Sequence, residues 1–261
     1  MPPELEARIE HARSASSDEL KSLLHESEEE ILLALLENPS FDQTHAELLL
    51  ERLDLSAKLV SAIAEHPKWL AAEGVRLRLA KHPHAPKRSA LSALRQLFLF
   101  DLARLSLTPS APADIRLAAE EAILGRIPHL PIGEKLTLAR RGPGRVAGAI
   151  LAEGHPQALK LALGNAFLTE SQVLKVLAKA HLPERVATAI AQHGKWSCQY
   201  NVRIALIRNT ATATVFVRAA LSDITLRDLK DLSELTELPV DRRNMIVEEL
   251  RRRSGSKHQQ T

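Results

Sequence analysis

The sequence predicts an all-α fold, an α-solenoid of helical hairpins arranged in two tandem units of 127 residues. Hydrophobic residues make up 45% of the 261 residues and aromatic residues only 3%, so Leu, Ala, Ile and Val supply most of the core, as suits closely packed helices. Apolar residues recur at helical spacing, for example at Leu59, Val60 and Ile63, and proline-marked turns interrupt them every 10–15 residues. The chain is also similar to itself at a fixed offset, which is typical of repeat proteins.

This internal similarity covers almost the whole chain. Residues 4–127 align with residues 131–254 without a gap, and 30 of these 124 positions are identical. The best-matched segment, residues 62–69, shares six residues with residues 189–196, including the only two tryptophans of the chain, Trp69 and Trp196. The shared register predicts two copies of one unit, residues 1–127 and 128–254, and a flexible C-terminal tail of residues 255–261.

Amphipathic stretches between the prolines predict the individual helices. In the first unit we expect helices near residues 4–13, 17–25, 28–37, 42–53, 56–65, 69–81, 86–97, 99–106 and 111–127. In the second unit we expect them near residues 131–141, 144–153, 155–164, 169–180, 183–193, 196–208, 213–222, 225–233 and 239–253. Four polar residues at helix starts are expected to be N-caps: Asp42, Ser56, Thr169 and Asp241.

Successive helices pair into hairpins of about 40–45 residues, the length of HEAT and armadillo units. With their proline-marked turns and recurring Asp and Arg, these hairpins resemble HEAT repeats. Residues 133–141 and 163–170 also resemble segments of uncharacterised bacterial HEAT-like repeat proteins. The resemblance implies a fold rather than an activity, and it implies a ladder of Asp–Arg pairs between neighbouring hairpins. The candidate pairs for this ladder are Arg76 with Asp101 and Arg203 with Asp228.

Charge is distributed unevenly along the chain. Residues 1–60 hold 14 Asp or Glu and 5 Lys or Arg, a net charge of −9, which leaves +12 for the remainder because the whole chain carries +3. Solvated helix faces explain such drift in most proteins, but it also favours attraction to polyanions or acidic proteins. A single cysteine, Cys198, excludes an internal disulfide and suits a reducing compartment, so we expect a cytoplasmic protein of bacterial type with no membrane segment.

Two kinds of ring side chain are candidates for binding. Trp69 and Trp196 each follow a lysine at an expected helix start; they are interpreted as packing residues, with binding hot spots as the alternative. The histidines His66, His82 and His84 lie close in sequence, but the ligand spacing of a zinc site is missing. Helix-end capping is therefore the favoured role, and no metal or other cofactor is expected.

Arginine clusters are the candidate phosphate contacts. Arg140, Arg141 and Arg145 surround a Gly-Pro-Gly sequence, where backbone amides beside arginines suit a phosphate, although a plain turn between helices is the favoured interpretation. Arg251, Arg252 and Arg253 form a basic C-terminal run, which suits either a nucleic-acid arm or the carbonyl end of a helix.

The pattern as a whole favours a non-enzymatic scaffold that binds a protein partner on a solenoid surface. Nucleic-acid binding through duplex backbone contacts of the basic second half is the alternative. A HEAT-like DNA glycosylase is the least favoured function, because an extruded base needs aromatic contacts and the chain has 2 Trp and 1 Tyr. No catalytic residues can be assigned from spacing alone.

Overall fold

A computed structural model describes residues 3–255 of the protein as twenty α-helices and one short 3-10 helix, with no strand among them. The all-α prediction is confirmed. Of the predicted C-terminal tail, Gly255 ends the last helix and residues 256–261 lie outside the described residues. Within residues 3–255, no helix has the length and apolarity needed to cross a bilayer.

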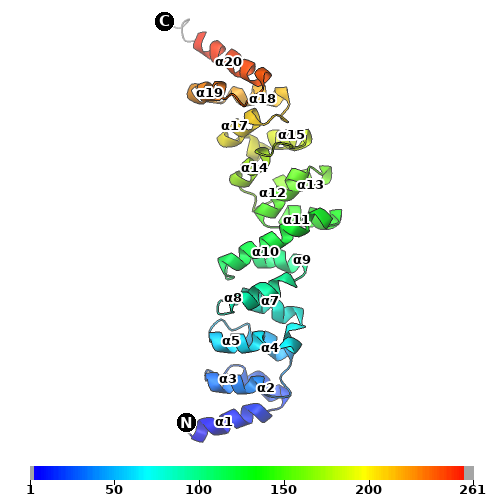
Figure 1. Ribbon diagram of the computed structural model, residues 1–261, viewed down its shortest axis with the longest axis vertical. Helices are drawn as coiled ribbons and strands as arrows, with labels where there is room; N and C mark the ends of the chain where they lie inside the picture. Colours follow the sequence, from blue (N-terminus) through cyan, green and yellow to red (C-terminus); the bar gives the residue numbers. More distant parts are fainter. Residues whose placement is uncertain (1–2, 256–261) are drawn as a thin grey trace. The chain divides into compact units, whose positions relative to one another are not determined.

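The chain divides into two compact units, residues 1–125 and 126–261. In unit 1, the helices run back and forth and pack on others within three elements of them along the chain, for example α1 on α3, α4 on α7 and α7 on α8 (Figure 1). Its helices are α1 (Pro3–Ser14), α2 (Ser17–Leu23), α3 (Glu29–Leu36), α4 (Gln43–Leu49), α5 (Ala57–Ala64), α6 (Pro67–Leu70), α7 (Glu73–Lys81), α8 (Lys87–Arg95), α9 (Leu99–Ser106) and α10 (Ala113–Arg126).

Unit 2 has the corresponding packing, with α11 on α13, α14 on α17 and α17 on α18. It begins with the 3-10 turn η1 (Ile127–His129). Its helices are α11 (Ile132–Arg141), α12 (Gly144–Glu153), α13 (Pro156–Leu163), α14 (Glu170–Leu177), α15 (Glu184–Gln192), α16 (Gly194–Ser197), α17 (Tyr200–Arg208), α18 (Thr214–Leu221), α19 (Leu226–Ser233) and α20 (Val240–Gly255).

Each helix from α2 to α10 begins 127 positions before its counterpart from α12 to α20. The pair α7 and α17 also ends at this offset, at Lys81 and Arg208. The apolar cores correspond in the same way: Leu79 and Leu206, or Ile63 and Ile190, are buried at equivalent places. Helix packing inside each unit therefore follows the register in which the two halves of the sequence align.

Two expected helices are each broken into two. Residues 69–81 form α6 and α7, and residues 196–208 form α16 and α17, with Ala72 and Gln199 extended at the breaks. The physical reason is an arginine that binds the carbonyls released at each break. Arg76 Nη1 donates to the carbonyl oxygens of Leu70 and Ala71, each over 2.9 Å, and Arg203 Nε donates to that of Ser197 over 2.8 Å.

The N-cap prediction is correct for three of four residues. Asp42 Oδ1 accepts the backbone N–H of Thr44 over 2.9 Å, Ser56 Oγ accepts that of Leu59 over 3.2 Å, and Thr169 is the N-cap of α14. It is wrong for Asp241, which lies inside α20. That helix begins at Val240 because the Pro239 carbonyl already accepts the first helical hydrogen bond, from Arg243.

A buried asparagine secures the first turn between hairpins in each unit. Asn38 and Asn165 are 4% and 2% exposed. The Asn38 amide donates to the carbonyls of Ala12 and Ala15, and the Asn165 amide donates to those of Ala139 and Gly142, all over 2.9–3.0 Å. Because buried main-chain carbonyls need donors, Asn38 satisfies the end of α1 from the turn after α3, and Asn165 satisfies the end of α11 from the turn after α13.

Candidate binding groove and other candidate sites

Both tryptophans are buried within their own units, as packing residues would be. Trp69 is 5% exposed, stacks on His66 with ring centroids 3.8 Å apart, and meets Phe41 edge-on. Trp196 is 2% exposed, and its Nε1 donates to the Leu163 carbonyl over 2.9 Å. The faces of both indoles are therefore enclosed rather than offered to a partner.

The Asp–Arg ladder implied by the HEAT resemblance does not form at the expected pairs. Arg76 pairs with Glu73 over 2.7 Å, while Asp101 pairs with Arg104 over 3.3 Å. In both pairs the partner lies three positions away on the same helix and is thus the nearest opposite charge.

The expected pair of the second unit does not form either. Arg203 pairs with Asp223 over 3.1 Å, and Asp228 accepts the hydroxyls of Tyr200 and Thr225. The hydroxyl contacts hold the pKa of Asp228 below its ordinary value, the one from Tyr200 most strongly.

The glycine-rich basic loop is packed inside the fold. Gly142, Pro143 and Gly144 are buried, and a Cβ added at Gly144 would lie 2.1 Å from the Phe167 carbonyl oxygen. The Gly142 amide already donates to the Leu138 carbonyl over 2.7 Å. These glycines thus allow close helix packing, and the Gly142 amide is already bound within the protein.

The arginines of the two basic clusters have different surroundings. Arg140 and Arg141 are exposed and have no ion-pair partner among residues 3–255, as is also true of Arg251. Arg145 is half-buried and has a partner of its own. Arg252 pairs with Glu249 over 2.7 Å.

Arg253 has a structural role in unit 2. It pairs with Glu249 over 2.6 Å and donates to the carbonyls of Leu221 and Ile224, over 2.6 and 2.7 Å. These carbonyls close the end of α18, so the Arg253 guanidinium is occupied by the protein itself.

Of the three candidate histidines, His82 and His84 bind main-chain carbonyls, whereas His66 stacks on Trp69. His82 Nε2 lies 2.8 Å from the Arg52 carbonyl oxygen, and His84 Nδ1 lies 2.6 Å from that of Leu55. Burial lowers the pKa of His82, although its bond to Arg52 acts in the opposite direction. Within the described part of the chain, no group of three or more His, Cys, Asp or Glu side chains is arranged to hold a metal ion.

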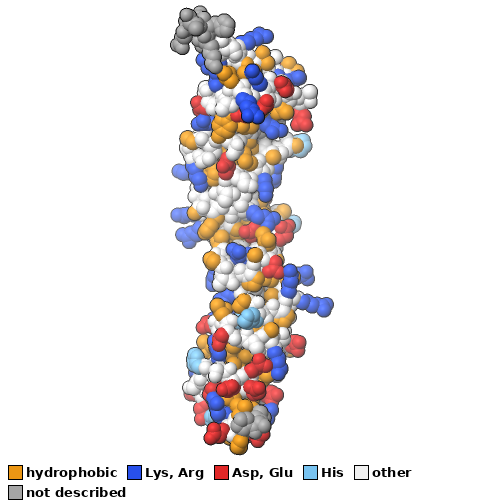
Figure 2. Space-filling model, turned by 90° about the vertical axis from the view of Figure 1, so that its left-hand side faces the viewer, with side chains coloured by type: hydrophobic (Ala, Val, Ile, Leu, Met, Phe, Trp, Pro, Cys, Tyr) orange, Lys and Arg blue, Asp and Glu red, His pale blue; other side chains and the backbone are white. Residues whose placement is uncertain are grey.

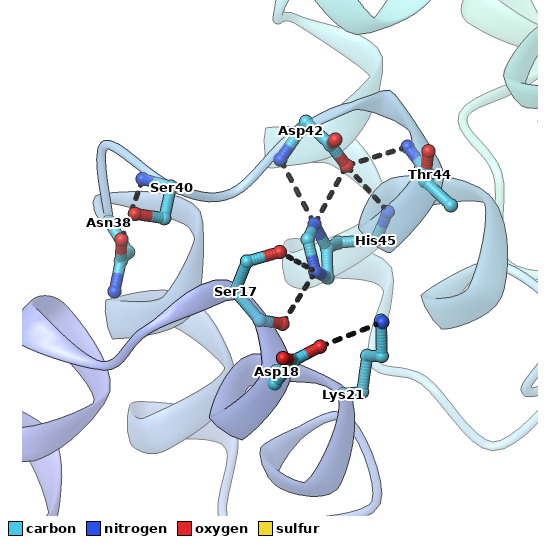
Figure 3. Close-up of polar contacts among 8 residues, drawn as sticks. All are labelled: Ser17, Asp18, Lys21, Asn38, Ser40, Asp42, Thr44 and His45. Carbon is cyan, nitrogen blue, oxygen red and sulfur yellow. Dashed lines mark hydrogen bonds and ion pairs between the residues drawn. The ribbon is translucent and has the colours of Figure 1, made fainter.

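The structure brings together a serine, a histidine and an aspartate that spacing alone does not reveal. Figure 3 shows the His45 ring between Asp42, at the start of α4, and Ser17, at the start of α2. His45 is 2% exposed, and its Nδ1 lies 2.7 Å from Asp42 Oδ1. Desolvation raises the Asp42 pKa, but hydrogen bonds from His45 and Thr44 outweigh it, so the net pKa lies below its ordinary value.

This cluster is arranged as a brace rather than as a catalytic triad. His45 Nε2 lies 3.1 Å from the Ser17 carbonyl oxygen but 3.5 Å from Ser17 Oγ, beyond the reach of roughly 2.6–3.2 Å that proton transfer to a base requires. The carbonyl only accepts, so Nε2 is the donor there. His45 thereby ties the starts of α2 and α4 together.

An open groove of about 700 Å³ lies in unit 2 between α14, α17 and the turn that precedes α20. Three half-buried apolar side chains, Leu174, Ile204 and Leu235, form part of its lining. Lys179 and Arg208 line it as well, and both are exposed and have no ion-pair partner among the described residues. This groove therefore combines an apolar surface with two cations that have no ion-pair partner among the described residues, which makes it a candidate binding site.

Sequence reasoning missed this groove, although the aligned halves contain a sign of it. Leu174 aligns with Glu47 of unit 1, and Ala205 aligns with Arg78. The same positions are therefore charged in unit 1 and apolar in unit 2. A position-by-position comparison of the two copies would have drawn attention to α14 and α17.

The two units also differ in charge. Residues 1–125 hold 20 Asp or Glu and 14 Lys or Arg, a net −6, and residues 126–261 hold 12 and 21, a net +9, which together give the +3 of the chain. Figure 2 shows Asp and Glu gathered over the first helices of unit 1, whereas Lys and Arg are the commoner charged groups over unit 2.

No family model matches the chain, and neither a curated protein nor a solved structure has a significant similarity to it.

Proposed function

We propose that this protein is a non-enzymatic α-solenoid scaffold of HEAT-like hairpins, built from two tandem 127-residue units, which binds a protein partner. The observation that carries the proposal is a constant internal frame combined with a variable surface. Repeat proteins characteristically keep their packing residues and vary their exposed ones to create binding surfaces.

Contacts inside the units support the constant frame. Asn38 and Asn165 bind equivalent pairs of carbonyls, and Arg76 and Arg203 bind equivalent helix ends. The variable surface is supported by the groove, where Leu174 and Ala205 of unit 2 stand at positions that are charged in unit 1. The free thiol of Cys198 suits the reducing cytoplasm that we propose as the location.

Affinity capture tests the protein-binding function. The full chain is immobilised, exposed to cell lysate with or without prior nuclease digestion, and the captured protein is then purified and titrated against the chain by calorimetry. We expect a saturable complex whose recovery does not depend on nuclease. Recovery only from the undigested lysate would contradict a protein partner.

Duplex binding through the phosphate backbone is a second candidate, favoured by one observation: Arg140 and Arg141 project from unit 2 without ion-pair partners in the described structure. Titration of a labelled duplex at several salt concentrations tests it, since the logarithm of the affinity falls by about 0.9 per phosphate contact for each logarithmic unit of salt. Replacing Arg140 and Arg141 by alanine should then reduce this slope.

Arg13 provides the matched control for that titration. It occupies the position in unit 1 equivalent to Arg140, but it pairs with Glu37 over 2.9 Å. Arg13→Ala should leave duplex affinity unchanged. An equal loss from Arg13→Ala and from the double variant would contradict a specific contact at Arg140 and Arg141.

A further inference from the structure

The groove of unit 2 occupies a place that ion pairs fill in unit 1. There, Arg78 of α7 reaches across to α4 and binds Glu47 over 3.0 Å and Glu51 over 2.8 Å. Gly74 makes room for this network, because a Cβ at that position would lie 2.2 Å from Glu47 Oε1. The charged side chains therefore bridge the two helices.

Unit 2 lacks every part of that network. Leu174 and Ala178 of the second copy replace the two glutamates, and Ala205 replaces the arginine. All three line the groove, together with Asn201, which stands at the position of Gly74. The groove is thus a consequence of specific replacements between α14 and α17, which pack on each other as α4 and α7 do.

Charges on the groove indicate what it would bind. Lys179 lies just after α14 and Arg208 ends α17, so both cations come from the C-terminal ends of their helices. Glu237 is contributed by the turn before α20. Two cations and one carboxylate leave a net charge of +1, within a unit that carries +9. Carboxylates placed beside Lys179 and Arg208 would satisfy charges that no described residue neutralises.

We propose that the groove binds an acidic amphipathic segment of a partner protein. Apolar side chains of that segment rest on Leu174, Ile204 and Leu235, and its carboxylates meet Lys179 and Arg208. The volume of about 700 Å³ and the open form suit several side chains of a helix or extended peptide. This inference rests on the proposed scaffold function, because it assigns that function a surface and a class of partner.

Peptide selection on the intact chain tests the inference. A display library of random peptides of about 16 residues, enough for roughly four helical turns, is selected on the immobilised protein. We expect the enriched peptides to combine Asp or Glu with Leu, Ile or Phe at helical spacing. Enrichment of basic or purely polar peptides would overturn the proposed chemistry.

A groove-closed variant provides the decisive comparison. Leu174→Glu, Ala178→Glu, Asn201→Gly and Ala205→Arg together transfer the unit 1 network into unit 2, where the helix packing already corresponds. We expect the variant to keep the helical circular dichroism and cooperative melting of the parent, and to bind the selected peptides at least about tenfold more weakly, as loss of a buried anchor does.

A second variant, Lys179→Glu with Arg208→Glu, changes only exposed residues and so keeps the test valid if the first variant folds poorly. It should weaken binding of acidic peptides but not of the same peptides with Glu replaced by Gln. Peptides that bind both variants as well as the parent would overturn the groove assignment while leaving protein binding intact. A library that yields no enriched peptide would contradict the scaffold function too. Displacement of the peptides by duplex DNA at physiological salt would favour nucleic acid as the ligand instead.

Discussion

Asn38 and Asn165 make the same set of hydrogen bonds, each inside its own unit and 127 positions apart. In both cases the side-chain amide donates to two carbonyls at the end of the first long helix of its unit, α1 or α11, and Oδ1 accepts the backbone N–H of the residue two positions later, over 2.7 Å. Because both asparagines are buried, water cannot replace these bonds. The turn between hairpins therefore depends on one side chain.

Asn165→Ala is predicted to destabilise unit 2 by about 2–4 kcal/mol, since two carbonyls and one N–H lose their buried partner. Asn38→Ala should cost a similar amount in unit 1. Urea unfolding followed by circular dichroism measures the change. Asn201→Ala is the control, because Asn201 is exposed and its hydrogen bond to Glu170, over 2.9 Å, is open to solvent, so it should contribute less than about 0.5 kcal/mol. A loss at Asn165 no larger than at Asn201 would show that the turn does not need these bonds.

Trp69→Ala and Trp196→Ala are each predicted to cost about 3–5 kcal/mol, because both remove a large buried side chain from a packed interior. The phenylalanine variants separate packing from hydrogen bonding. Trp196→Phe should lose about 1 kcal/mol more than Trp69→Phe, since within the described residues Trp196, unlike Trp69, donates a hydrogen bond, to the Leu163 carbonyl. Thermal melts of the four variants provide the comparison, and parental stability in Trp69→Ala would revive its interpretation as a binding hot spot.

The helices were largely predictable because periodicity and proline are local properties of the chain. The breaks at Ala72 and Gln199 were not, since neither contains a proline or glycine. They depend on Arg76 and Arg203, whose long side chains return to carbonyls five or six positions earlier. The 127-residue register, by contrast, predicted which helices would correspond, and the matched asparagines support the tandem-unit proposal.

The candidate site was harder to predict because it depends on residues that face one another across two helices. Arg76 and Asp101 were expected to pair from the resemblance to HEAT repeats, but a nearer carboxylate, Glu73, binds the arginine. Likewise, nothing local in α14 or α17 indicates a groove. It exists because Leu174 and Ala205 stand where a charged pair would close the gap.

Gly144→Ala is predicted to destabilise unit 2 by about 1–3 kcal/mol, because the new methyl group would overlap the Phe167 carbonyl and force the α12 start away from the turn before α14. Gly133→Ala is the matched control, since a Cβ there meets nothing within 4 Å. It should leave stability unchanged or raise it by less than about 1 kcal/mol. Chemical denaturation of both variants checks the difference, and equal behaviour would mean that the loop is not tightly packed.

Acid stability should depend on Glu249. Hydrogen bonds from Arg252 and then from Arg253 lower its pKa from 4.5 to about 2, against an opposing effect of burial. A carboxylate with a lowered pKa in the folded state stabilises the protein above pH 4.5, and this contribution disappears as the pH falls from about 4.5 to about 2.

Glu249→Gln is therefore predicted to lower the free energy of unfolding by about 1–3 kcal/mol at pH 7 and to change it little at pH 2. The lower part of the range allows for solvent screening of the ion pair with the exposed Arg252. Unfolding by urea at a series of pH values measures both limits. Glu248→Gln is the control, because Glu248 is exposed and has no ion-pair partner among residues 3–255. The two variants should differ at pH 7 and converge near pH 2; a constant difference across this range would show that Glu249 acts through packing rather than through its charge.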